Sequence, residues 1–289
     1  MNKKAVKLLI KLLLTGLALY LVFRKIDTST TLAIIQGANA IYLILAWLFF
    51  ILSKVFSAVR LNYFFRDLGV RLPAVENLKL YGIGMFYNLF LPGGIGGDGY
   101  KVFLLNKFHG TPVKQLLQSV LLDRLNGLVV LIFLMLLLVF WADIAIVFPL
   151  PVEGLATAGL ILLAAGFYGM MRLFFSAFMG STVITLLYSF LVQIMQLVCA
   201  YFILLALEIH TQLIAYQFVF LLSSVVAVLP LTIGGVGARE LVFIVSHDYL
   251  GIDKNAAVAF SLLFFLITAL SSLTGAFLSF GGKAGKEPA

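Results

Sequence analysis

Long apolar runs occupy most of this chain and restrict the environment in which it can fold. Hydrophobic residues make up 63% of the 289 residues and charged residues only 11%, and the mean hydropathy is +1.12. Soluble globular proteins carry about 25% charged residues, so this chain has too few polar side chains to cover its surface. We therefore expect its solvent to be lipid.

Six segments are long enough to cross a bilayer as helices, which requires roughly 20 mostly apolar residues. They are 5–23, 41–62, 113–141, 155–173, 182–207 and 256–280. Lys7 and Lys11 interrupt the first segment, but their side chains can reach the membrane interface. That segment ends in "FRK" and not in a small-residue cleavage site, so we expect an uncleaved anchor. The fold class predicted is an all-α integral membrane protein.

Two further apolar stretches, 78–108 and 213–248, are each interrupted by a cluster of proline and glycine. Neither half of either stretch is long enough to cross the membrane alone. Irregular backbone is tolerated at membrane depth only where protein or a wet cavity surrounds it. Each stretch is therefore predicted to be a re-entrant hairpin of two half-helices.

The basic residues are concentrated in certain loops, as the orientation of membrane proteins requires. The N-terminal stretch contains Lys3 and Lys4, the C-terminal stretch contains Lys283 and Lys286, and the loop "ADIAIVFPLPVEG" has no Lys or Arg. We expect a multi-pass protein of the inner (cytoplasmic) membrane with both termini in the cytoplasm. The net charge of +8 does not indicate a nucleic-acid partner, because the basic residues form no stripe with interleaved aromatics.

The two interrupted stretches contain similar sequences. "LPGGIGGDGYK" at 91–101 and "LPLTIGGVGAR" at 229–239 agree at six of eleven positions without a gap. The order of span, hairpin and span also repeats, so one membrane domain (1–289) would contain repeats at 41–141 and 182–280, joined by a span at 155–173. The predicted orientation makes the copies antiparallel, and such inverted repeats with broken helices are typical of alternating-access transporters.

The predicted turns combine helix-breaking residues with positive charge. Their prolines and glycines are Pro92, Gly93, Gly94, Gly96, Gly97 and Gly99 in the first hairpin, and Pro230, Gly234, Gly235 and Gly237 in the second. Glycine allows positive φ and close backbone approach, and amides at the start of an outgoing half-helix favour an anion. With Lys101 and Arg239, the two turns would form a pocket suited to a phosphate. The alternative is that the glycines only pack the half-helices together.

Ionisable residues inside predicted membrane segments are candidates for function, because burying them in lipid is unfavourable. They are Lys54, Arg60, Asp98, Asp123, Arg124 and Glu240. We expect Asp98 or Asp123 to pair with Arg124 or Lys54, and Glu240 to pair with Arg239. A purely structural role for these pairs is the alternative.

Nothing in the sequence indicates a metal site, a cofactor or a catalytic nucleophile. His109, His210 and His247 are isolated and lack metal-ligand spacing. Gly94, Gly96 and Gly99 match G-x-G-x-x-G, but that motif requires a preceding strand, which this chain is not expected to contain. The single cysteine, Cys199, lies in an apolar run and is read as a small core residue.

Three sequences, "NLFLPGGIGGDGYK", "DRLNG" and "VLPLTIGGVGARE", resemble the lysylphosphatidylglycerol synthase transmembrane-region family. This is the flippase-like domain also found at the N-terminus of the multiple peptide resistance factor. The resemblance covers essentially the whole chain and implies movement of a polar-headed lipid between leaflets. The functional residues that it implies here are Asp98, Lys101, Asp123, Arg124, Arg239 and Glu240.

Two departures from the family pattern qualify this expectation. The soluble aminoacyltransferase domain of bifunctional members has no counterpart here, so we expect no enzyme activity. The family often has Arg at the position of Lys101, and a lysine replaces the bidentate fork of arginine by a point charge.

The function predicted is that of a flippase for a polar-headed, phosphate-bearing lipid. Two alternatives stay open: an intramembrane transferase acting on lipid-linked substrates, and a non-transporting partner of a lipid or glycan synthase. The partners considered are membrane lipids, such a synthase and a second copy of the chain.

Overall fold

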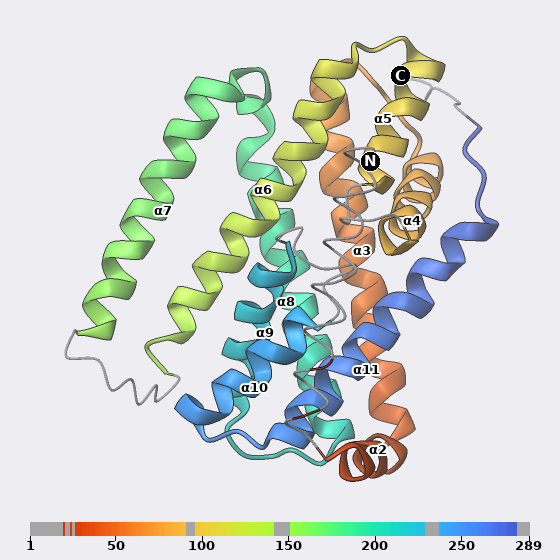
Figure 1. Ribbon diagram of the computed structural model, residues 1–289. Helices are drawn as coiled ribbons and strands as arrows, with labels where there is room; N and C mark the ends of the chain where they lie inside the picture. Colours follow the sequence, from red (N-terminus) through yellow and green to blue (C-terminus); the bar gives the residue numbers. More distant parts are fainter. Residues whose placement is uncertain are drawn as a thin grey trace, which may run out of the picture.

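The computed structural model describes Tyr20, Arg24 and residues 27–90, 96–141, 151–228 and 237–281. Across these residues the chain is helical and contains no strand (Figure 1). The helices are α2 (Thr28–Gln36), α3 (Ala40–Asp67), α4 (Ala74–Phe90), α5 (Gly96–His109), α6 (Val113–Leu138), α7 (Val152–Phe174), α8 (Thr182–Ala206), α9 (Leu213–Val228), α10 (Ala238–Leu250) and α11 (Lys254–Leu273). Short 3-10 turns, η1 (Ser176–Ser181) and η2 (Thr274–Phe277), precede α8 and follow α11. The all-α fold class is confirmed.

Five helical segments of the described chain are long and apolar enough to span a bilayer. They are Ala40–Asp67, Val113–Leu138, Val152–Phe174, Ser176–Ala206 and Lys254–Phe277. These correspond to five of the six predicted spans, and the remaining one, 5–23, lies almost entirely outside the described residues. The helix predicted at 41–62 extends to Asp67. The short helix α2 was not predicted.

Side-chain caps and a left-handed glycine set several helix ends. The carboxylate of Asp27 accepts from backbone amides at the start of α2, and Asn39 does the same for α3. Asp253 caps α11 through the Ala256 amide at 2.8 Å. Gly251 follows α10 with φ +66°, a conformation that glycine adopts without a Cβ penalty.

Helices α3 and α8 form the centre of the bundle and pack through interlocking aromatic rings. Phe202 of α8 lies between Tyr42 and Phe49 of α3, with ring centroids 6.3 and 5.4 Å apart. At another point of the same interface, Tyr188 of α8 lies next to Phe56 and Tyr63 of α3, with ring centroids 6.3 and 5.7 Å apart. The four α3 rings recur every seven residues, the spacing at which side chains of one helix fit into holes of another.

Four of the short helices pack as two pairs, α4 against α5 and α9 against α10. Figure 1 shows the first pair in the upper part of the bundle and the second pair in the lower part. The joining segments 91–95 and 229–236, with Pro92, Gly93, Gly94, Pro230, Gly234 and Gly235, lie outside the described residues. The depth of the two turns, and with it the inverted repeat, therefore stays a prediction.

Two of the predicted turn glycines show a reason for being glycine. A Cβ on Gly97 of α5 would lie 1.9 Å from the carbonyl oxygen of Gly84 in α4, so the two backbones touch. Gly237, just before α10, has φ +82°. By contrast, a Cβ on Gly99 would meet nothing within 4 Å. Close packing of the first helix pair is thus shown at one position, and positive φ is shown in the second pair.

Candidate functional site

A cavity of about 290 Å³ lies where both short helix pairs meet the long helices. In the described part of the chain, seven helices line it: α3, α4, α5, α6, α8, α9 and α10. Its charged lining residues are Lys54, Arg60, Lys101, Arg124 and Arg239, with Asp98 and Asp123 as the acids. Among the described residues the lining therefore carries five basic and two acidic groups. Five of the six predicted site residues are brought together here, and Glu240 is not.

Asp98 is held by two cations at the start of α5. Its Oδ1 accepts from Lys101 Nζ at 3.1 Å, and its Oδ2 accepts from Arg124 Nε of α6. The side chains of Asp98 and Lys101 are only 9% and 6% exposed. A carboxylate in the first turn also interacts favourably with the helix dipole. The pairing of Asp98 with Arg124 was one of the predicted alternatives and is confirmed.

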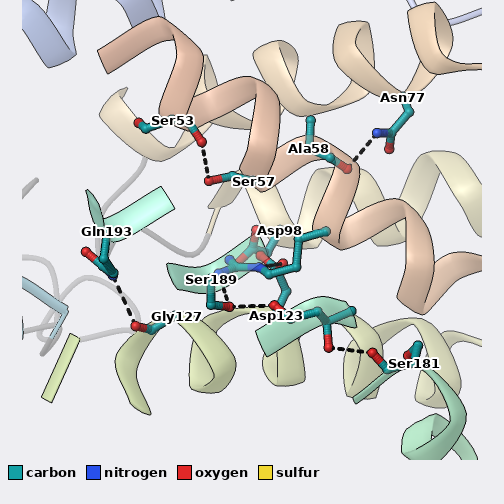
Figure 2. A network of polar contacts seen from close by, with 12 residues as sticks. Ser53, Ser57, Ala58, Asn77, Asp98, Asp123, Gly127, Ser181, Ser189 and Gln193 are labelled. Atoms are coloured by element: carbon teal, nitrogen blue, oxygen red, sulfur yellow. Dashed lines mark hydrogen bonds and ion pairs between the residues drawn. The ribbon is translucent and has the colours of Figure 1, made fainter. Parts of the chain in front are cut away.

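Asp123 forms a second, separate ion pair. Arg60 Nε of α3 donates to Asp123 Oδ1 at 2.7 Å, and Arg60 Nη1 donates to Ser189 Oγ of α8 at 2.9 Å. A Cβ on Gly127 would lie 3.2 Å from that Nη1, so this glycine leaves room for the guanidinium. Figure 2 shows Asp98, Asp123 and Ser189 close together at the centre of this polar network.

The other alternative, a pair of Asp123 with Arg124 or Lys54, is not the one that forms, because Asp123 pairs with Arg60. Adjacent residues on a helix do not face each other, so Asp123 and Arg124 take partners on different helices. Arg60, one of the charges predicted to lie inside a membrane segment, is 5% exposed and lies inside α3.

Glu240 stabilises helix α10 and does not line the cavity. Its Oε2 accepts from the Gly237 amide at 2.7 Å, and its Oε1 accepts from Ser261 Oγ of α11 at 2.9 Å. The expected pairing with Arg239 was wrong for the same geometric reason. The Arg239 guanidinium lies instead over the ring of Phe264, 4.8 Å from its centroid.

Lys54 lies over the Phe50 ring, with Nζ 4.5 Å from its centroid. No described acidic side chain forms an ion pair with Lys54 or Arg239. These two cations therefore differ from the other three basic residues of the cavity, each of which is bonded to a carboxylate.

Neutral polar groups also line the cavity. Gln193 Nε2 donates to the Gly127 carbonyl at 3.1 Å, joining α8 to α6 (Figure 2). Asn88 Oδ1 accepts from the Gly97 amide at 2.8 Å. Buried Gln193 Oε1 and Ser224 Oγ have no hydrogen-bond partner among the described residues. Buried polar atoms are usually satisfied, so these two are available to a ligand or to water.

Sequence reasoning missed several residues of the cavity. Tyr81 of α4 lies beneath Lys101, whose Nζ is 4.7 Å from the ring centroid, and Ser57 and Ser224 add hydroxyl groups. Nothing local in the sequence distinguishes these side chains from other polar residues on apolar helices. Among the described residues, no group of three or more His, Cys, Asp or Glu is placed to hold a metal ion.

A family model described as the lysylphosphatidylglycerol synthase TM region matches residues 8–275. No curated protein matches the chain. Together with the long apolar helices, the family match identifies a multi-pass membrane protein with a lipid-related function.

Proposed function

Because this chain belongs to the lysylphosphatidylglycerol synthase transmembrane-region family, we propose that it moves a polar-headed, phosphate-bearing lipid between the leaflets of the cytoplasmic membrane. The cavity would hold the head group while the acyl chains stay in the bilayer. A volume of about 290 Å³ is at the small end of ligand pockets, and it suits a head group better than a whole lipid.

The observation that supports this proposal is the excess of positive charge in the cavity. Five basic and two acidic side chains of the described chain line it, in a bundle with five helical segments that are long and apolar enough to span a bilayer. Isolated charge in a low-dielectric interior is unfavourable, and an anionic head group would compensate it. Fixed cations and hydroxyls would replace the water that the head group leaves behind when it enters the membrane.

The same geometry favours transport over an intramembrane transferase reaction. A transferase needs a carboxylate or another base available to the substrate, or a metal held by carboxylates. Asp98 and Asp123 are both bonded to cations, and Glu240 is bonded to Gly237 and Ser261. We therefore propose that the chain is not an enzyme. We also propose that membrane lipids are its partners. From the basic residues near both ends of the chain we propose that both termini are cytoplasmic.

The test is leaflet exchange by purified protein reconstituted in vesicles that contain fluorescent phospholipids. We expect the protein to accelerate exchange, and Arg239→Gln to slow it. Arg66→Gln is the matched control, because Arg66 also lies over a ring, that of Tyr63 at 5.3 Å, but outside the cavity. Formation of a new lipid product would instead indicate a transferase. Neither exchange nor product would favour the non-transporting partner of a synthase.

A further inference from the structure

Lys54 and Arg239, the two cavity cations that have no ion-pair partner among the described residues, share one structural support. Lys54 lies over Phe50 and Arg239 lies over Phe264. The Phe50 and Phe264 rings themselves meet edge to face, with centroids 5.8 Å apart. Both rings are buried, with exposures of 1% and 4%. Two rings in contact therefore support one cation from α3 and one from α10, and both cations line the same cavity.

These two rings position the cations without neutralising them. The faces of aromatic rings attract cations, but they carry no net charge. The carboxylates of the cavity are engaged elsewhere, Asp98 with Lys101 and Arg124, and Asp123 with Arg60. No carboxylate among the described lining residues therefore neutralises the positive charges of Lys54 and Arg239.

Unsatisfied polar atoms lie in the same cavity. Ser224 is 6% exposed and its Oγ has no hydrogen-bond partner among the described residues. The hydroxyl can donate to an anion, whereas the guanidinium of Arg239 can donate through two N–H groups at once. A tetrahedral phosphate offers enough acceptor oxygens for all of these donors together with the Lys54 ammonium.

We propose that Lys54 and Arg239 together bind the phosphate of the head group, and that the ligand is a lipid phosphomonoester or diphosphate in preference to a phosphodiester. A phosphomonoester carries about 1.5 to 2 negative charges at pH 7, which matches the two cations. A phosphodiester carries one, and would leave one cation of the pair uncompensated in a low-dielectric site. The inference rests on the proposed function, because it assumes that the cavity receives a lipid head group.

The experiment measures binding to the purified full chain in detergent at pH 7.5. The probes are dioctanoyl phosphatidic acid, a monoester; dioctanoyl phosphatidylglycerol, a diester; and inorganic phosphate. We expect phosphatidic acid to bind at least about tenfold more tightly than phosphatidylglycerol. Lys54→Met and Arg239→Met should each weaken phosphatidic acid binding by about tenfold to a hundredfold, the loss expected for a hydrogen bond to a charged group. Both should bring the affinities for the two lipids together.

Matched variants separate this role from a structural one. Lys107→Met removes a lysine that also lies over a ring, Phe108 at 5.6 Å, but outside the cavity, so binding should not change. Lys54→Arg keeps the charge and should keep the preference for the monoester. Neither Lys54→Met nor Lys107→Met breaks an ion pair of the described chain, so the unfolding temperature without ligand should not fall.

Several results would overturn the assignment. One is that the unmodified protein binds the two lipids with equal affinity. Another is that Lys54→Met binds phosphatidic acid as tightly as the unmodified protein does. Inorganic phosphate that binds as tightly as phosphatidic acid would overturn the lipid part, because the acyl chains would then contribute nothing.

Leaflet exchange of the same two lipids separates this inference from the proposed function. Preferential binding of phosphatidic acid without accelerated exchange would refute transport and leave the site assigned. Equal binding of the two lipids with accelerated exchange of both would support transport and refute the site assignment.

Discussion

The buried pair of Arg60 and Asp123 allows a quantitative prediction. The two side chains are 6% and 10% exposed, and Nε and Oδ1 are 2.7 Å apart. Removing one partner of such a pair leaves an uncompensated buried charge, which costs about 3–5 kcal/mol. Asp123→Asn keeps an oxygen that can accept from Arg60, so we expect the lower end, about 3 kcal/mol. For a chain of this size that corresponds to an unfolding temperature about 5 °C lower.

The assay is thermal unfolding of purified variants in one detergent, arranged as a double-mutant cycle. The single variants of the cycle are Arg60→Met and Asp123→Leu, and each should destabilise the protein by about 3–5 kcal/mol, because it leaves the other charge buried and uncompensated. The double variant Arg60→Met/Asp123→Leu removes both charges together and should recover most of the loss. Ser189 keeps its own hydrogen bond to the Thr185 carbonyl at 2.9 Å in that variant, so it is not left without a partner.

Two outcomes would refute the reasoning. If Asp123→Asn unfolds at the same temperature as the unmodified protein, the pair does not stabilise the bundle. If the two single losses simply add in the double variant, there is no coupling between the side chains. A stable double variant that no longer binds phosphatidic acid would place the pair in the ligand site and remove its purely structural role.

Three further predictions concern packing, capping and ionic strength. Gly97→Ala should destabilise the protein by about 1–3 kcal/mol or more, because its Cβ would lie 1.9 Å from the Gly84 carbonyl oxygen, whereas Gly99→Ala has open space and should be neutral or stabilising in the same unfolding assay. Glu240→Gln should lower stability by about 1 kcal/mol, since it removes the charged acceptor of the Gly237 amide, and a variant as stable as the unmodified protein would contradict that role. Raising the salt concentration should weaken phosphatidic acid binding only modestly, because buried charges are screened less than exposed ones, and a steep dependence in a titration would point to binding at the surface.

The spans could be predicted from the sequence because length and apolar composition alone define them. Five of them need nothing beyond a long and mainly apolar run. The helix α2 escaped prediction, although Asp27 before "TSTT" is an N-cap signal of the usual kind. The aromatic residues at positions 42, 49, 56 and 63 also form a readable heptad pattern, and it marks the face of α3 that meets α8.

The ion pairs could be predicted only in part. The sequence identified Asp98, Asp123 and Arg124 as charges inside the membrane, but partners depend on how far each helix is rotated about its axis. Neighbours in sequence, such as Asp123 and Arg124, point in different directions, so proximity along the chain was misleading. The contact of Phe50 with Phe264 joins residues more than 200 positions apart, and no local pattern announces it.

The aromatic seam between α3 and α8 limits how this bundle can change shape. Tyr188 and Phe202 of α8 each lie next to two rings of α3, so sliding the two helices along the seam would make these rings collide. Rotation of other helices about the seam leaves these ring contacts unchanged. If the protein alternates between a state open to one side of the membrane and a state open to the other, α3 and α8 would form its fixed axis. The two short helix pairs would be the parts that move.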